Sequence, residues 1–143
     1  MLSKSRIITL SVIAVFIVIQ LIPVNQTNPP IVQSAEMPGD VESIMRESCF
    51  DCHSNETKWP WYSRIAPGSF LITYDVNEGR KHLNFSDFSG MDSFDSSDVA
   101  DELIEVLEEG KMPVPQYLIL HPSASLSDSE TEILLNWAES LQY

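Results

Sequence analysis

Residues 49–53 are Cys-Phe-Asp-Cys-His. The two thiols of this stretch are separated by two residues, and an imidazole follows the second thiol directly. Thiols at this spacing can each add to one of the two vinyl groups on a porphyrin edge, which leaves His53 under the ring as an iron ligand. The C-x-x-C-H pattern is typical of c-type haem attachment. It predicts one covalent haem per chain, at Cys49 and Cys52.

Three other chemistries compete for the same two cysteines. A redox-active dithiol of the thioredoxin kind needs a surrounding β-α-β pattern, which the sequence does not offer. A structural disulfide is possible if the chain is exported. A zinc site normally takes four ligands, whereas the two remaining histidines, His82 and His121, are isolated in the sequence. The adjoining His53 favours haem over all three.

Composition limits the classes of protein that remain. The chain has 143 residues, a formal net charge of −13 and an apolar fraction of 43%. This apolar content is enough for a packed core, and the length suits one modest domain. The acidity argues against a nucleic-acid partner, because phosphates would be repelled. Two cysteines are too few for a scaffold held by several disulfides.

An apolar segment lies near the N-terminus. Residues 7–22 carry no charged side chain, and Lys4 and Arg6 lie just before them. A positive flank before an apolar run is typical of a membrane anchor or a secretion signal. Because no clear cleavage site follows directly, we expect residues 1–6 in the cytoplasm and an uncleaved transmembrane helix over residues 7–24, with a signal sequence as the alternative. The haem domain would then face the periplasm or the cell exterior from the cytoplasmic membrane.

Residues 25–39 contain three prolines and no apolar periodicity. This composition predicts a linker between the membrane and the domain. The alternative is an ordered strap along the domain surface, which the apolar Ile31 and Val32 would permit. The folded, haem-binding domain is expected to span residues 40–143.

Within that domain the apolar spacing is helical, and no two segments pair convincingly as strands. A capping box at Ser127 and Glu130 marks the start of the last helix. The expected fold class is therefore all-α, with long loops over residues 59–67 and 84–97. The expected helices are Asp40–Ser48, Ser69–Lys81, Asp98–Glu109 and Asp128–Leu141.

A second axial ligand would complete the coordination of iron. Met112 lies in the stretch Lys-Met-Pro-Val-Pro of residues 111–115, where prolines stiffen the backbone and prevent the methionine from being absorbed into a helix. A thioether ligand stabilises ferrous iron and raises the reduction potential. Filling a gap in the core is the alternative role for Met112. His82, His121, Met91 or an open position are the alternatives for the ligand.

Two stretches resemble the haem-binding domain family of small exported cytochrome-c-like proteins. They are Ser48–Phe88, with its Trp-Pro-Trp-Tyr tract at 59–62, and Glu108–Glu139. The resemblance implies a cytochrome-c-like helical fold, covalent haem at the two cysteines and His53 as the proximal ligand. By similarity with class I c-type cytochromes, Met112-Pro113 would supply the distal ligand. Val114 departs from the more usual Met-Pro-Pro run.

The two propionates of haem need donors in an acidic domain. Trp59, Arg64 and Arg80 are the candidates that we single out, with Trp61 and Lys81 as further possibilities. An exposed arginine on the surface and a tryptophan in the core are the ordinary alternatives. The apolar run Tyr117–Leu120 is expected to wall the distal side of the haem.

These features favour a single-electron carrier rather than an enzyme. With His53 and Met112 both on iron, no position remains for a substrate and no catalytic residue is predicted. A peroxidase-like enzyme or a gas or redox sensor with a labile distal ligand is the alternative, and a haem-free dithiol redox domain is a weaker one. The acidic clusters at 92–98 and 101–109 are either a solvated face or a docking surface for a basic redox partner protein.

Overall fold

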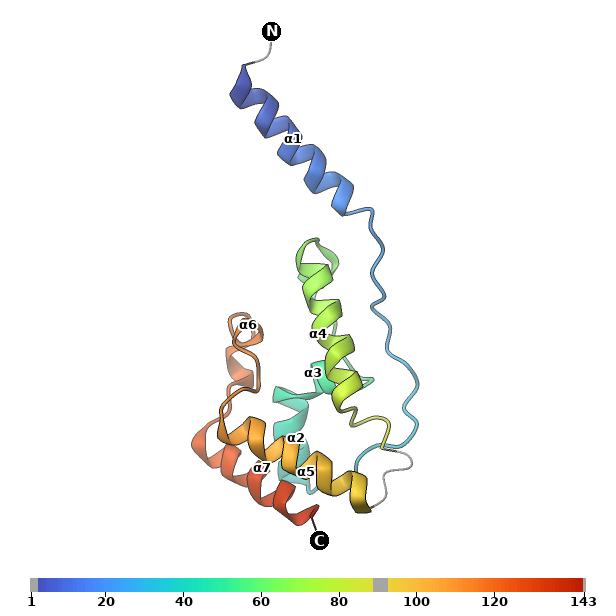
Figure 1. The fold of residues 1–143 in the computed structure, drawn as a ribbon, viewed down its shortest axis with the longest axis vertical. Helices are drawn as coiled ribbons and strands as arrows, with labels where there is room; N and C mark the ends of the chain where they lie inside the picture. The colour runs from blue at the N-terminus through green and yellow to red at the C-terminus, as the bar shows by residue number, and fades with distance from the viewer. Residues whose placement is uncertain (1–2, 89–92, 143) are drawn as a thin grey trace.

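The chain folds into a small helical domain with a helix projecting from its N-terminal side (Figure 1). The computed structural model describes residues 3–88 and 93–142, with the side chains of 93–96 left out. Among these residues the only β-structure is an isolated bridge between Gln33 and Asp87, so the expected all-α class is confirmed. The helices are α1 Lys4–Ile19, α2 Gly39–Ser48, α3 Phe50–His53, η1 Trp61–Arg64, α4 Gly68–His82, α5 Ser93–Glu108, α6 Pro115–Leu118, η2 Pro122–Ala124 and α7 Asp128–Ser140.

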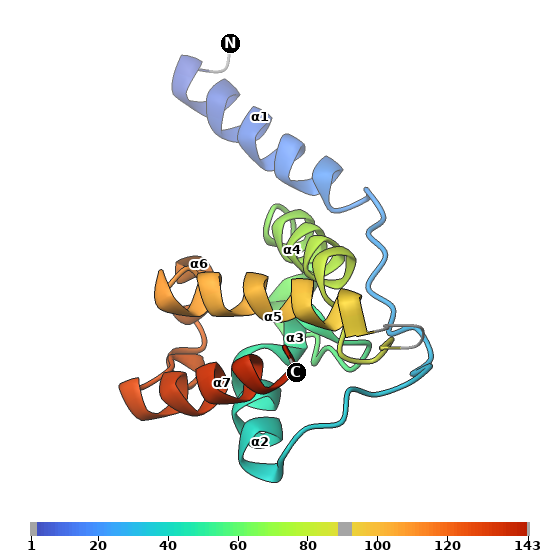
Figure 2. The same ribbon diagram turned by 60° about the horizontal axis from the view of Figure 1, so that its bottom comes forward.

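The core lies between α2, α5 and α7. Helices α5 and α7 pack side by side (Figures 1 and 2), and α2 contacts α7, below which it lies in the view of Figure 2. The buried apolar side chains come from all three helices and from the segments next to the C-x-x-C-H turn. They are Val41, Met45, Phe50, Phe85, Leu103, Leu107, Leu134, Trp137 and Ala138.

Three of the expected helices form with ends within two residues of those predicted. Helix α7 begins with the predicted capping box, in which Glu130 N donates to Ser127 Oγ and Ser127 N donates to Glu130 Oε2. Helix α5 begins at Ser93 instead of Asp98. No glycine or proline interrupts residues 91–109, so nothing in the backbone prevents the helix from starting earlier.

The loop over residues 59–67 also differs from expectation. It contains the short helix η1, and Trp61 is 75% exposed, which does not fit the core position given above as the alternative to a propionate contact. The predicted loop 84–97 is divided. Phe85 is buried in the core, residues 89–92 lie outside the described part of the chain, and the remainder belongs to α5.

The predicted transmembrane helix over residues 7–24 is wrong. Helix α1 ends at Ile19, and Leu21 to Val24 continue as irregular chain. Its 16 residues rise about 24 Å, short of the roughly 30 Å hydrocarbon core of a bilayer. Among the described residues, no helix is long and apolar enough to span a membrane. The single-pass anchoring in the cytoplasmic membrane that was expected from this helix is contradicted with it.

The chain between α1 and α2 lies along the domain as a strap, which we define as residues 20–35 (Figure 1). At its start the Gln20 amide makes two bonds to the backbone of Ala66, as donor to the carbonyl at 3.1 Å and as acceptor from the N–H at 2.9 Å. At its end Ala35 N donates to Phe85 O at 2.9 Å, and Val32 N donates to Ser86 O at 3.0 Å. The open alternative of an ordered strap therefore describes this segment better than a free linker.

Helices α3 and α4 approach unusually closely at Gly79. A Cβ atom built on Gly79 would lie 2.6 Å from the carbonyl oxygen of Cys52 and 3.1 Å from its Cβ. Glycine is unfavourable inside a helix, and its presence here lets the backbone of the C-x-x-C-H turn rest directly on α4. The sequence signal was available, because Gly79 interrupts an otherwise helical pattern.

We predict that Gly79→Ala destabilises the domain. Because the added Cβ would collide with backbone atoms, overpacking should cost roughly 2–3 kcal/mol, in the upper part of the usual range, and the gain in helix propensity of about 1 kcal/mol offsets only part of it. Urea unfolding should therefore show a net loss on the order of 1–2 kcal/mol. Gly39→Ala is the matched control, because a Cβ there meets nothing within 4 Å. Equal stability of the two variants would contradict the close approach.

Candidate functional site

The C-x-x-C-H residues form one helical turn of their own. Helix α2 ends at Ser48, the backbone changes direction at Cys49, and α3 follows from Phe50 to His53. The turn closes through His53 N, which donates to Cys49 O at 2.9 Å. Residues at positions i, i+3 and i+4 share one helix face. This places the side chains of Cys49, Cys52 and His53 toward the same cavity, which all three line.

His53 is held in the tautomer that a metal ligand needs. Its Nδ1 lies 3.1 Å from the carbonyl oxygen of Leu83. A carbonyl can only accept, so Nδ1 carries the proton and Nε2 keeps its lone pair. Burial lowers the pKa of His53, which favours the neutral ring. Phe85 N donates to the carbonyl of His53 at 2.8 Å and fixes the backbone as well. A hydrogen bond from the second ring nitrogen, as from His53 Nδ1 to the Leu83 carbonyl, is typical of metal-binding histidines.

The two cysteines are free thiols in a half-buried position. Burial, followed by the charge of the second cysteine, raises the pKa of Cys49 to about 12. Burial, followed by the neighbouring Asp51, raises the pKa of Cys52 to about 11. Reactive dithiols have lowered pKa values, so this environment disfavours the dithiol alternative. Among the described residues, no group of three His, Cys, Asp or Glu side chains is arranged to hold a bare metal ion.

The cavity has a volume of about 310 Å³, within the range of roughly 300–1,000 Å³ that is usual for small-molecule sites. Its walls come from α3, α4, α5 and the loop that carries Met112. Apolar side chains dominate them, among which are Leu83, Val99, Leu103, Val106 and Leu107. Three acidic residues, Asp75, Glu78 and Glu102, also line the cavity, and we call them its acidic rim. A flat apolar cofactor with an iron centre fits this donor set of two thiols, one imidazole and one thioether.

Met112 reaches the cavity because α5 ends sharply. Gly110 has φ +60°, its N–H donates to Leu107 O at 3.2 Å, and Lys111 N donates to Val106 O at 3.0 Å. This pair of bonds is the Schellman pattern of a helix end. Met112 follows two residues later and lines the cavity, with its side chain 38% exposed. The structure therefore brings Met112 together with Cys49, Cys52 and His53.

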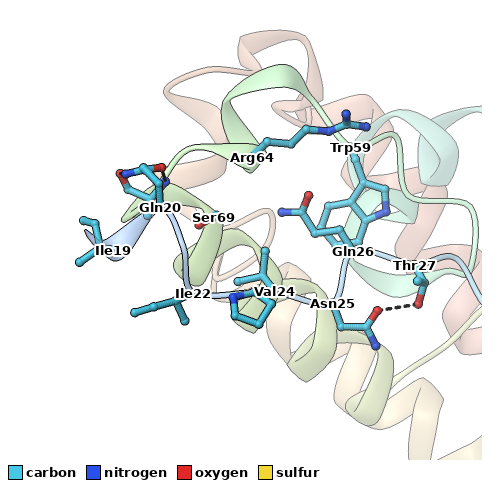
Figure 3. A pocket seen from close by; sticks show the side chains of 12 residues that line it. Ile19, Gln20, Ile22, Val24, Asn25, Gln26, Thr27, Trp59, Arg64 and Ser69 are labelled. Carbon is cyan, nitrogen blue, oxygen red and sulfur yellow. Dashed lines mark hydrogen bonds between the residues drawn. The ribbon is translucent and has the colours of Figure 1, made fainter. Parts of the chain in front are cut away.

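The other predicted haem contacts lie elsewhere. Trp59 and Arg64 line a different pocket, which they form with the end of α1 and the first residues of the strap (Figure 3). Trp59 Nε1 donates to Asn28 Oδ1 at 3.1 Å. The Lys81 side chain pairs with Glu78. Their proposed role at the propionates remains a prediction without a contact that supports it.

Arg80 is occupied in holding the fold. Its guanidinium donates to the carbonyls of Ser54 and Thr27, to Asn28 Oδ1 and to Thr57 Oγ1, at distances between 2.7 and 2.9 Å. These acceptors come from the strap and from the loop after the C-x-x-C-H turn. The arginine therefore ties the strap to that loop and does not line the cavity.

The predicted distal wall is only partly present. Tyr117 lines the cavity, whereas Ile119 and Leu120 are exposed. Sequence reasoning missed the Leu83 carbonyl and the hydroxyl of Tyr117, which bonds Asp51 at 2.8 Å. No pattern in the sequence indicates a backbone carbonyl as a partner. His82 lines the cavity, His121 does not, and Met91 lies outside the described residues.

Fold and site together define a small all-α protein built around one apolar cofactor cavity. Comparison with known families is consistent with this class: the Haem-binding domain family matches residues 14–140. The match covers most of the chain, so the chain belongs to this family and its cofactor is haem. The matched range includes the strap. Neither a search of curated proteins nor a search of solved structures found a significant match.

We predict that Arg80→Lys lowers stability and leaves the haem spectrum unchanged. Lysine cannot reproduce four hydrogen bonds in a planar fork, and the loss of charged hydrogen bonds should cost roughly 2 kcal/mol in chemical unfolding. Arg64→Lys is the control, since Arg64 is exposed; it should stay within about 0.5 kcal/mol of the wild type. A shifted haem spectrum in Arg80→Lys with unchanged stability would instead support a propionate role.

Proposed function

We propose that the chain is a c-type haem protein that works as a single-electron carrier. In this proposal one haem is attached through thioethers at Cys49 and Cys52, and His53 and Met112 are the axial ligands of iron. The observation that carries the proposal is that these four side chains, from two distant segments, line one apolar cavity. A haem-binding domain without covalent attachment would not need the two thiols on the same helix face as the histidine.

Haem, when bound, supplies an iron centre that changes between ferric and ferrous states by one electron. The chain's own residues bind, orient and shield it. His53 offers Nε2 because Leu83 holds Nδ1. Met112 offers a soft sulfur that favours the ferrous state. The apolar side chains of α5 exclude water from the interior face. With both axial positions taken by protein ligands, electron transfer needs no catalytic acid, base or nucleophile.

We expect the full chain, made together with a cytochrome c maturation system, to carry covalent haem. Intact mass should exceed that of the polypeptide by one haem. A pyridine haemochrome spectrum should show that both vinyl groups of the haem have been converted to thioethers. Cys49→Ser and Cys52→Ser should each leave one thioether, and the double variant should lose covalent haem. Polypeptide of unchanged mass in the wild type would contradict the proposal.

The acidic rim of the cavity supports a redox partner with a basic docking face. Glu78 and Glu102 lie at this rim, and further exposed acids follow along α5. Opposite charge accelerates encounter, and salt screens it over a Debye length of about 8 Å at physiological ionic strength. Electrons would therefore enter or leave preferentially through this edge of the domain.

We predict that electron exchange with a cationic metal complex such as hexaammineruthenium slows as salt is added, whereas exchange with an anionic complex such as ferricyanide accelerates. Stopped-flow absorption of the haem measures both rates. Glu78→Gln with Glu102→Gln should weaken the salt dependence. A matched loss of two charges on α7, Glu132→Gln with Glu139→Gln, should weaken it less. Equal effects of the two pairs would show that net charge alone is responsible and that the rim is not a docking surface.

A further inference from the structure

The loop that carries Met112 is joined to the C-x-x-C-H turn by a side-chain hydrogen bond. Tyr117, in α6, donates from its hydroxyl to Asp51 Oδ2 at 2.8 Å. Asp51 is one of the two residues between the cysteines. Its other oxygen, Oδ1, accepts from the backbone N–H of Lys58 at 2.9 Å. The carboxylate is therefore held at both oxygens and offers Tyr117 a fixed acceptor.

Tyr117 is itself held in one orientation. Its ring stacks on His121 with centroids 4.1 Å apart and an angle of 17° between the planes. His121 donates from Nδ1 to the carbonyl of Tyr117 at 3.1 Å, which leaves Nε2 to accept from the Tyr62 hydroxyl at 3.0 Å. Burial, followed by the Asp51 carboxylate, raises the pKa of Tyr117, so its hydroxyl remains protonated and able to donate.

Met112 has little else to hold it in place. Among the described residues, its backbone takes part in no hydrogen bond. Its side chain is partly exposed, and the backbone of α6 lies close to that of η2 but not to that of α3 or α5. Tyr117 follows Met112 by five residues, and both line the cavity. The bond from Tyr117 to Asp51 thus connects the two sides of the cavity, one bearing the cysteines and the other the methionine.

We propose that Tyr117 and Asp51 are positioning residues: their hydrogen bond acts as a latch that keeps Met112 over the cavity, and breaking it opens the sixth position of iron to an external ligand. This inference rests on the proposed function, because it assumes that Met112 is an iron ligand. It goes further by assigning the control of that ligand to two residues that do not touch iron. With the Tyr117–Asp51 hydrogen bond formed, Met112 stays on iron and electron transfer is favoured. With the bond broken, small neutral ligands can bind at the sixth position.

The test compares Tyr117→Phe with wild-type holoprotein, using imidazole as the external ligand. The variant keeps the ring that stacks on His121 and removes only the hydroxyl. We expect the apparent imidazole affinity of the ferric protein to rise about tenfold to a hundredfold. This range corresponds to the free energy that one hydrogen bond to a charged group contributes. The methionine–iron charge-transfer band of the ferric form should weaken in parallel. Tyr74→Phe, at an exposed tyrosine on α4, is the control and should change neither quantity.

Asp51→Asn provides a second variant that retains a polar partner for Tyr117. It should show a smaller rise in imidazole affinity than Tyr117→Phe, and combining the two substitutions should give less than the product of their separate effects. Urea unfolding of each holoprotein separates a latch from a general stabilising role. Lower stability with unchanged imidazole affinity would overturn the latch.

Two outcomes distinguish this inference from the proposed function. Wild-type ferric protein that lacks the methionine–iron band would overturn Met112 as a ligand, and the latch with it. Wild-type protein that shows the band, together with a Tyr117→Phe variant whose band and imidazole affinity are both unchanged, would overturn the latch alone and leave the electron-carrier proposal standing.

Discussion

The close contact between α3 and α4 is the constraint on which the site depends. Gly79 removes the side chain that would collide with the Cys52 carbonyl, so the C-x-x-C-H turn can rest on the backbone of α4. The residues that follow α4 can then reach the motif. Leu83 orients the His53 ring through its carbonyl, and Phe85 N bonds the His53 backbone. One short segment, residues 79–85, therefore supports the imidazole and packs against the neighbouring cysteine.

The other half of the site has much weaker support. Met112 is displayed by a sharp helix end and a loop whose contacts with the motif are made by side chains such as Tyr117. This difference has a physical consequence. The proximal side is fixed by backbone hydrogen bonds in a packed core, whereas the distal side depends on a few polar contacts near the surface. Local stability is expected to differ between the two sides, with the distal loop opening first.

Much of this organisation could be predicted from local patterns. The capping box at Ser127, the apolar face of α5 and the i, i+3, i+4 spacing of the motif all act over a few residues, so the sequence displays them directly. Tertiary interactions could not be seen in this way. The pairing of the Gln20 amide with the backbone of Ala66 joins residues far apart in the chain, and it marks the point where the apolar N-terminal run has already left its helix. The hydrogen bonds of Arg80 could not be predicted for the same reason, because its acceptors are mostly backbone carbonyls and small polar groups from two distant segments.

The strap is also joined to the rest of the domain by hydrogen bonds. Hydrogen bonds from residues 20–35 to the loops around the motif make this segment part of the fold, in agreement with a family match that starts at residue 14.

NMR of the ferrous holoprotein with ¹³C-labelled methionine methyl groups tests most directly whether haem lies between His53 and Met112. The porphyrin ring current shifts a methyl group above the ring far upfield. We predict that one of the five methionine signals is shifted in this way and vanishes in Met112→Leu. Five signals at ordinary positions, or a shifted signal that survives the substitution, would contradict the account.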